Sequence, residues 1–247
     1  MALINNPLAA NFAGMTLTAN GSIVSGDSVS GVDGRLEIVG GVAQATLYPT
    51  DAETGPGGRI RSEIVWPYNS VGEFWYSWEF LIHEHEWQIP TADPIAVMSI
   101  HDVADGGDSA RHPNLGVRVV AGQLRIEVPS ATLPTESTDA NRIATVPFEF
   151  GVWHKCVLHA NWQTDATGFR EFFFDGVPIL RQFNVPTHYD DVAGPYAKVG
   201  VYDHSNIRNY TRLRAYFRNC FSLAGMQTYA SVLGNVPMQP VRRLQIA

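Results

Sequence analysis

The stretch NLGVRVVAGQLRIEVP, at residues 114–129, decides the fold class of this chain. Its apolar residues recur at every second position on both sides of the pair Ala121-Gly122. Successive side chains of a β-strand point to opposite faces, so a period of two is the period of a strand with one buried face. The stretch therefore predicts an antiparallel hairpin whose apolar face carries Leu115, Val117, Val119, Leu124, Ile126 and Val128.

Patterns of the same kind fill most of the chain, at residues 34–49, 72–82, 153–163, 170–183, 196–204 and 210–219. Within 170–183, the pair Asp175-Gly176 is a strong signal for a tight hairpin turn. Helical spacing is rare, and we expect one helix, over 223–233, with Leu223, Met226, Ala230 and Leu233 on one face. Strands at this spacing predict an all-β sandwich of two antiparallel sheets.

Composition excludes several classes of protein. Of the 247 residues, 45% are hydrophobic and 17% are charged, which is enough apolar material for a sizeable core and too little charge for disorder. The net charge of −7 argues against a nucleic-acid binder. No apolar run approaches the ~20 residues of a membrane-spanning helix. We therefore expect neither a nucleic-acid partner nor insertion into a membrane.

The two ends of the chain differ from its middle. Residues 1–34, rich in Gly, Ser and Asn, are expected to form an arm or the first strands, and residues 35–218 the main domain. Residues 219–247 are expected to be an extension with a short helix. Both ends suit assembly into a homo-oligomer or a virion, and simple tails are the alternative. The N-terminus lacks the basic region and apolar core of a secretory signal. The chain is therefore expected to be a mature form or to leave the cell by another route, such as a phage particle.

Two segments and two cysteines raise the question of metal or thiol chemistry. Residues 81–87 carry His83 and His85 on one strand face without an evident third ligand, so an exposed strand edge is the better interpretation. Residues 102–112 carry acidic side chains and glycines that suit calcium, although their spacing is not that of an EF-hand. We expect no metal, with calcium in this loop as the alternative.

Two cysteines do not make a disulfide scaffold. Cys156 is expected to be a buried thiol, and a single disulfide bridge between Cys156 and Cys220 stays open as the alternative.

Polar side chains collect on one face of three predicted strands. Residues 196–204 read YAKVGVYDH, and alternation places Tyr196, Lys198, Tyr202 and His204 together. The same rule puts Arg59 with Arg61 and Glu63, and Ser99 with His101. By pattern alone, the Arg61–Glu63 pair is a surface ladder and His101 is a structural histidine. Arginine is 15 of the 17 basic residues, which suits an acidic ligand and is equally explained by codon usage.

The order of these motifs resembles that of the jelly-roll polysaccharide lyases, which include alginate, glucuronan and heparin-lyase-like enzymes. The motifs are RSEI (61–64), SIH (99–101), the segment 151–180 and YAKVGVYDH (196–204), and the resemblance covers roughly residues 35–218. It implies a concanavalin A-like jelly roll with a concave groove for an acidic polysaccharide. The implied activity is that of a carbon–oxygen lyase, which cleaves a polysaccharide beside a uronic acid by β-elimination. A phage-borne member of this group is one identity that the resemblance leaves open.

The resemblance also assigns roles to residues. It implies that Tyr202 is the catalytic acid and a candidate base, that His101 neutralises the sugar carboxylate or acts as base, and that Arg61 contacts the carboxylate. Lys198 becomes a cleft cation that favours the ionised phenol, and Gly200 leaves room for a sugar. Tyr196 and Glu63 are supporting residues, and Arg118 and Arg125 are cleft candidates from their outward faces alone.

Two positions depart from the pattern of these lyases. Ser99 and His204 each stand where the family motif has a glutamine. A serine hydroxyl is shorter than the glutamine amide that helps to neutralise the carboxylate. These departures leave a second hypothesis open, in which the protein is a non-catalytic, lectin-like module or a structural module of a phage tail or capsid. On either hypothesis the protein is expected to be extracellular or associated with a virion.

Overall fold

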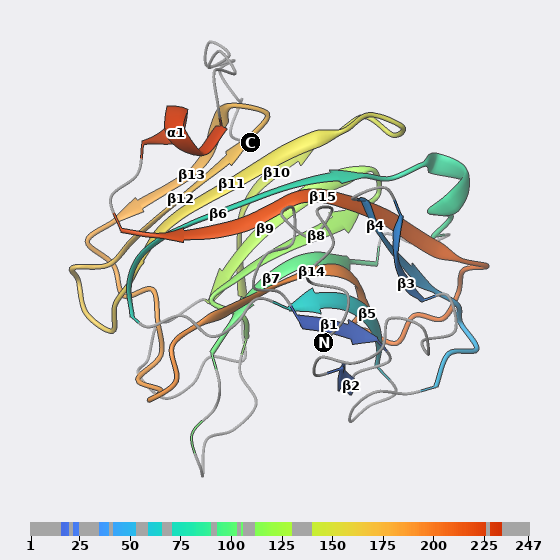
Figure 1. Ribbon diagram of the computed structural model, residues 1–247, viewed down its shortest axis with the longest axis horizontal. Helices are drawn as coiled ribbons and strands as arrows, with labels where there is room; N and C mark the ends of the chain where they lie inside the picture. The colour runs from blue at the N-terminus through green and yellow to red at the C-terminus, as the bar shows by residue number, and fades with distance from the viewer. Residues whose placement is uncertain are drawn as a thin grey trace.

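The computed structural model describes residues 16–19, 22–24, 35–39, 42–52, 59–65, 71–89, 93–102, 105, 112–129, 140–225 and 228–233. Two antiparallel sheets lie one over the other (Figure 1). The all-β sandwich expected from the sequence is therefore confirmed. None of the described helices is long and apolar enough to cross a membrane.

The first sheet has eight strands. In spatial order they are β10 (Ala140–Pro147), β9 (Gln123–Pro129), β8 (Leu115–Val120), β7 (Ile95–His101), β14 (Tyr196–Asp203), β5 (Ile60–Val65), β1 (Thr16–Ala19) and β2 (Ser22–Val24). Residues 1–34 thus supply two strands at one edge of this sheet.

The second sheet has seven strands. In spatial order they are β13 (Val177–Phe183), β12 (Phe169–Phe174), β11 (His154–Trp162), β6 (Gly72–Leu81), β15 (Leu213–Ala224), β4 (Val42–Leu47) and β3 (Leu36–Val39). Two short helices complete the described elements, the 3-10 helix η3 (Glu84–Glu86) and α1 (Tyr229–Leu233).

The two hairpins that the sequence predicts are both present. In the turn between β8 and β9, φ is 49° at Ala121 and 73° at Gly122. In the turn between β12 and β13, φ is 47° at Asp175 and 80° at Gly176. Two successive residues with positive φ give a turn whose twist matches that of the flanking strands, which is why Gly is favoured at the second position.

The core lies between the sheets and is rich in aromatic side chains. Trp78, Trp162 and Tyr76 are fully buried there, and the indole nitrogen of Trp162 donates a hydrogen bond of 2.9 Å to the phenol oxygen of Tyr76. Cys156 and Cys220 are buried free thiols, so no bridge joins them. The apolar face predicted for residues 114–129 is buried throughout, in keeping with the sequence pattern.

Two local expectations are wrong. The segment 223–233 does not form one helix, because β15 keeps pairing with β6 as far as Ala224 opposite Phe74, and the helix begins only at Tyr229. Residues 81–87 do not continue a strand edge either. The chain turns through η3, and buried Glu86 binds Arg212, Arg214 and Tyr216. These long-range pairs are absent from the local pattern. Met226 lies outside the described residues.

Gly200 is required by the approach of β14 to β5 rather than by a sugar. Its φ is +155°, and a Cβ placed there would collide with the backbone carbonyl of Ser62 and lie 2.6 Å from Cα of Glu63. The expectation that this glycine leaves room for substrate is therefore corrected.

Replacing Gly200 with alanine should destabilise the fold. The added methyl group has to displace the β5 backbone, which we expect to lower the free energy of unfolding by at least about 2 kcal/mol, measured by urea unfolding. Gly116→Ala is the matched control, because its Cβ would lie 3.8 Å from Nε of Arg118, an ordinary contact. Equal stability of the two variants would contradict the role given to Gly200.

Candidate functional site

The polar face of the eight-stranded sheet carries a cleft of about 510 Å³. Its lining comes from β7, β8, β9 and β14, the loops beside them and the residue just before β5. The lining residues are Arg59, Ala96, Ser99, His101, His112, Pro113, Gly116, Arg118, Arg125, Glu127, Tyr202 and His204.

Strand register explains why these side chains meet. One row across five strands reads Arg61, Tyr202, Ala96, Arg118 and Arg125. A neighbouring row reads Lys198, Ser99, Gly116 and Glu127. Small residues stand at the middle of both rows, so the sheet surface is hollow there and flanked by long polar side chains.

A bulge in β7 sets which of its residues face the cleft. The register with β8 shifts between Ala96 and Met98. Val97 and Met98 are consequently both buried in the core, while Ala96, Ser99 and His101 all line the cleft. A strict alternation would have put Ala96 on the core side. Bulges re-aim side chains in this way and are frequent beside active sites.

Tyr202 is supported by charged residues of β5 and β14. The guanidinium carbon of Arg61 lies 4.8 Å from the centre of the Tyr202 ring. Buried Glu63 lies between two cations, with Oε2 3.9 Å from Nη1 of Arg61 and 3.8 Å from Nζ of Lys198. Nζ of Lys198 also lies 5.3 Å from the ring centre of Tyr196. These supporting residues stand beside the cleft lining rather than in it.

Ser99 and His101 present polar atoms to the cleft from β7. Ser99 is 3% exposed, and its Oγ has no hydrogen-bond partner among the described residues. The ring of His101 lies against that of Tyr196, with centres 5.9 Å apart. An unpartnered buried hydroxyl at the floor of a cleft is a group available to a ligand.

Electrostatics keep His101 neutral. Burial, followed by the charges of Lys198, His112, Arg61 and Arg118, lowers the pKa of His101 well below its usual value. The cations around the ring disfavour another positive charge at that point. For the same reason they favour a negative one, such as a carboxylate.

Arg118 holds the other side of the cleft together. Its Nε lies 2.5 Å from Oε2 of Glu127, its Nη1 is hydrogen-bonded to the ring of His204, and its Nη2 lies 3.3 Å from Nε2 of His112. Nε of Arg125 lies 2.6 Å from the second oxygen of the same carboxylate. Burial opposes ionisation of Glu127, but hydrogen bonding to His112 and the two arginines lower its pKa to about 2.

His204, like His101, is kept neutral by burial and by nearby positive charge. Burial and the positive charge of Arg118 lower the pKa of His204 to about 3. Its ring centre lies 6.0 Å from that of Tyr202. The residue that replaces the glutamine of the family motif is therefore an uncharged hydrogen-bonding group beside the phenol.

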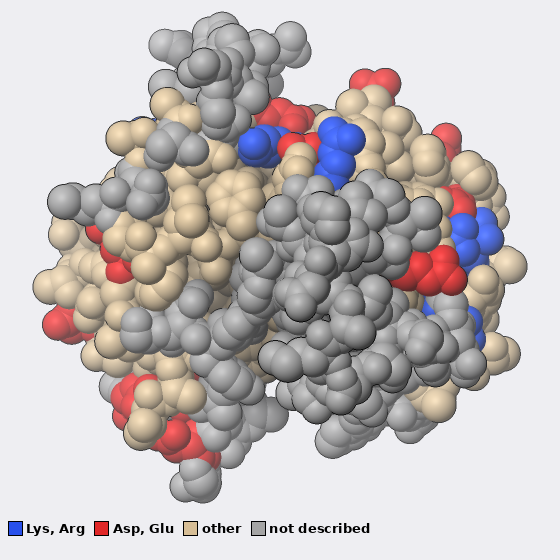
Figure 2. Space-filling view, in the orientation of Figure 1, with Lys and Arg blue, Asp and Glu red and all other residues tan. Residues whose placement is uncertain are grey.

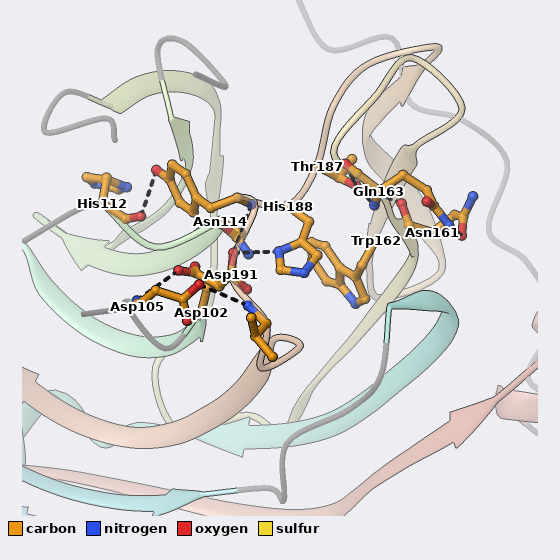
Figure 3. Close-up of polar contacts among 12 residues, drawn as sticks. Asp102, Asp105, His112, Asn114, Asn161, Trp162, Gln163, Thr187, His188 and Asp191 are labelled. Atoms are coloured by element: carbon orange, nitrogen blue, oxygen red, sulfur yellow. Dashed lines mark hydrogen bonds and ion pairs between the residues drawn. The ribbon is translucent and has the colours of Figure 1, made fainter. Parts of the chain in front are cut away.

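A buried polar cluster around Asp102 and His188 reaches the cleft-lining residue His112 (Figure 3). Nδ1 of His188 lies 2.8 Å from Oδ2 of Asp102, which also accepts a hydrogen bond from the backbone nitrogen of Tyr189. The Tyr189 hydroxyl donates to the backbone carbonyl of His112. The loop between β13 and β14 is therefore hydrogen-bonded both to the end of β7, where His101 lies, and to the residues that precede β8.

This cluster bears on the calcium alternative. The Asp102 carboxylate is used by His188 and Tyr189, and Oδ2 of Asp105 accepts from the backbone of Val192. Among the described residues, no group of three or more acidic, histidine or cysteine side chains is placed to hold a metal ion. Asp108 lies outside the described residues.

Six residues of the lining were not site candidates from the sequence, and three of these six, Arg59, His112 and Glu127, carry ionisable side chains. Glu127 shares a face with Arg125 two positions earlier, so alternation was sufficient to include it. Arg59 was grouped with Arg61 by alternation without being chosen. His112 comes from a segment without strand periodicity and carried no local signal.

Charge in the cleft differs from charge elsewhere. On the face seen in Figure 2, basic side chains lie next to acidic ones, and further acidic side chains gather apart from them. The cleft lining has three arginines and a single carboxylate. A net positive cleft in a chain of net charge −7 indicates an anionic ligand at this point.

Comparisons with known proteins agree with the fold. An endo-β-1,4-glucuronan lyase from the fungus Trichoderma reesei matches with a TM-score of 0.61 and 20% identity over 88% of this chain and 89% of that one. An alginate lyase from Pseudomonas aeruginosa matches with a TM-score of 0.60 and 16% identity, over 86% of this chain and 98% of that one. A family 7 alginate lyase in complex with the substrate GGMG matches with a TM-score of 0.63 and 17% identity, over 92% of this chain and 97% of that one.

These structural matches confirm the expected jelly-roll sandwich. No curated protein matches the chain significantly in sequence. A family model described as polysaccharide lyase, however, matches residues 19–220. Because that match spans most of the chain, this protein belongs to the polysaccharide lyase family, and the carbon–oxygen lyase class expected from its motifs is confirmed.

Proposed function

We propose that this protein cleaves a uronic-acid-containing polysaccharide by β-elimination in the cleft between Tyr202 and His101. The observation that carries the proposal is the combination of a phenol, a neutral imidazole and an unpartnered hydroxyl in one positively charged cleft. The solved structures that the chain resembles include lyases named for glucuronan and alginate, which supports the same class of substrate.

The first requirement of the reaction is to neutralise the sugar carboxylate, so that the proton on carbon 5 becomes acidic. Ser99 supplies a hydroxyl donor whose bonding capacity is unused among the described residues. Arg61 and Lys198 supply positive charge, although Glu63 shares both cations. Stabilisation of the enolate-like anion by such fixed groups is the largest contribution that a site of this kind makes.

Proton transfer then falls to the two remaining groups. The neutral ring of His101 accepts the proton from carbon 5, and the electron pair left behind forms the double bond between carbons 4 and 5. The bond from carbon 4 to the bridging oxygen breaks, and the Tyr202 hydroxyl gives that oxygen its proton. The products are a new chain end and an unsaturated uronate, and no water is consumed.

The partner in this proposal is an acidic polysaccharide, met outside the cell. Attachment to a virion and assembly through the terminal segments stay predictions. The lectin-like alternative differs in one respect, because it binds the same polymer without forming the double bond. Measuring both binding and the absorbance of the double bond on alginate, glucuronan, heparin-like and capsular polymers separates the two.

Tyr202→Phe should abolish most of the activity and leave the fold intact. Loss of a general acid costs a factor of roughly 100 to 10,000, and we expect kcat, followed by absorbance of the double bond, to fall within that range. Tyr216→Phe removes a hydroxyl that lies outside the cleft lining and binds Glu86, and it should retain activity. A fully active Tyr202→Phe variant would remove Tyr202 from the mechanism.

Ser99→Ala tests the neutralising group. Its Oγ makes no hydrogen bond among the described residues, so thermal unfolding should shift little or towards higher stability. If Oγ donates to the substrate carboxylate, kcat/KM should fall about tenfold, the cost of one hydrogen bond to a charged group. Unchanged kcat/KM together with unchanged stability would show that Ser99 only lines the cleft.

The pH profile tests His101. Burial, followed by the charges of Lys198, His112, Arg61 and Arg118, lowers the pKa of His101 well below its usual value of 6.5. The ring therefore stays unprotonated as the pH falls through 6.5. The acidic limb of kcat/KM, which reports the free enzyme, should therefore lie below pH 6.5. A bound carboxylate favours the protonated ring, so the limb of kcat should lie at higher pH than that of kcat/KM. A kcat/KM limb at or above pH 6.5 contradicts the assignment of His101 as base.

A further inference from the structure

We infer that Arg125, held by Glu127, forms a second anion subsite that binds the acidic group of a sugar neighbouring the one that is cleaved. This inference rests on the proposed function and extends it to the charge pattern of the substrate. The chemistry recognised is a carboxylate or sulfate oxygen, which the planar guanidinium of arginine binds through paired N–H groups.

Arg118 and Arg125 differ in how much of each guanidinium group is already engaged by the protein. Each of the three nitrogens of Arg118 already contacts a cleft residue, as described above. Arg125 meets Glu127 in an ion pair through Nε, and among the described residues its two terminal nitrogens take part in no ion pair or hydrogen bond. Nε of Arg125 is buried, whereas the side chain as a whole is 20% exposed and lines the cleft.

Arg125 lies several strands away from Tyr202, the proposed proton donor. Tyr202, Ala96, Arg118 and Arg125 stand opposite one another on four successive strands. Strands lie 4.7–4.9 Å apart, so the Cα atoms of Tyr202 and Arg125 are separated by about 14 Å. The acidic group on the reacting sugar does not bridge that span, whereas one on a neighbouring sugar of a chain that crosses the strands does.

Glu127 contacts both arginines and neutralises their charge only in part. Glu127 is 7% exposed and compensates one charge, but Arg118 and Arg125 both contact it. The pair of arginines therefore keeps a net charge of about +1 on the β8–β9 side of the cleft. Fixing Arg125 through Nε reduces the side-chain entropy lost when an anion binds.

Arg125→Gln tests the inference, with Arg181→Gln as the matched control. Arg181 is 55% exposed on β13 and pairs with Glu171, so its loss changes net charge equally without touching the cleft. In Arg125→Gln, Glu127 keeps Arg118 and His112 as partners, so this variant should fold as Arg181→Gln does. Urea unfolding of both variants checks this. The substrates are polyglucuronate, polymannuronate and the same polymers with part of their carboxylates reduced to alcohols.

We expect Arg125→Gln to raise KM on the fully acidic polymers roughly tenfold, with kcat within twofold of the wild type and a weaker dependence of KM on salt. Reduction of neighbouring carboxylates should raise KM of the wild type and remove most of the difference between it and the variant. Arg181→Gln should match the wild type throughout. If Arg125→Gln and Arg181→Gln have the same KM and salt dependence, the subsite is overturned.

The design separates this inference from the proposed reaction. If no polymer yields the double bond, the proposed reaction is contradicted. The affinity of each variant for the same polymers is then measured as Kd by isothermal titration calorimetry. Weaker binding by Arg125→Gln than by Arg181→Gln then supports the subsite without the reaction. Equal binding by both variants overturns it.

Discussion

The register of β14 between β5 and β7 is the constraint on which the rest of the molecule depends. Val199 and Val201 of this strand are buried in the core, while Tyr202 faces the cleft. A slip by one residue would exchange these faces and destroy core and cleft together. Gly200 fixes the register, because only a residue without a Cβ permits the approach of the Ser62 carbonyl at that point.

The cleft is assembled by two buried carboxylates that organise cations. Glu63 lies between Arg61 and Lys198 on one side, and Glu127 binds Arg118 and Arg125 on the other. Burying such pairs costs desolvation energy that the attraction only partly offsets. Their contribution is therefore to function more than to stability. They fix the positions of the guanidinium groups. Burial, together with the positive charge that these groups leave, lowers the pKa of His101.

Alternation in the sequence was sufficient for the features that depend on neighbouring residues. It predicted the 114–129 hairpin and the shared face of Tyr202 and His204, and the Asp175-Gly176 pair itself predicted the second hairpin turn. It failed where a contact joins distant residues. The β7 bulge that brings Ala96 into the cleft, the place of His112 beside Arg118 and the pairing of β15 up to Ala224 all arise from tertiary structure. Such contacts leave no period in the local sequence.

The two departures from the family motif acquire a common physical interpretation. A glutamine at position 99 would supply a long donor, whereas Ser99 supplies a short one above a floor of small residues, Ala96 and Gly116. At position 204, the imidazole replaces an amide and binds Arg118. In the proposed reaction, neutralisation of the carboxylate therefore depends less on a side-chain amide and more on the surrounding cations, which act at longer range. A site built in this way depends more strongly on salt and on the charge density of its polymer than one based on an amide donor.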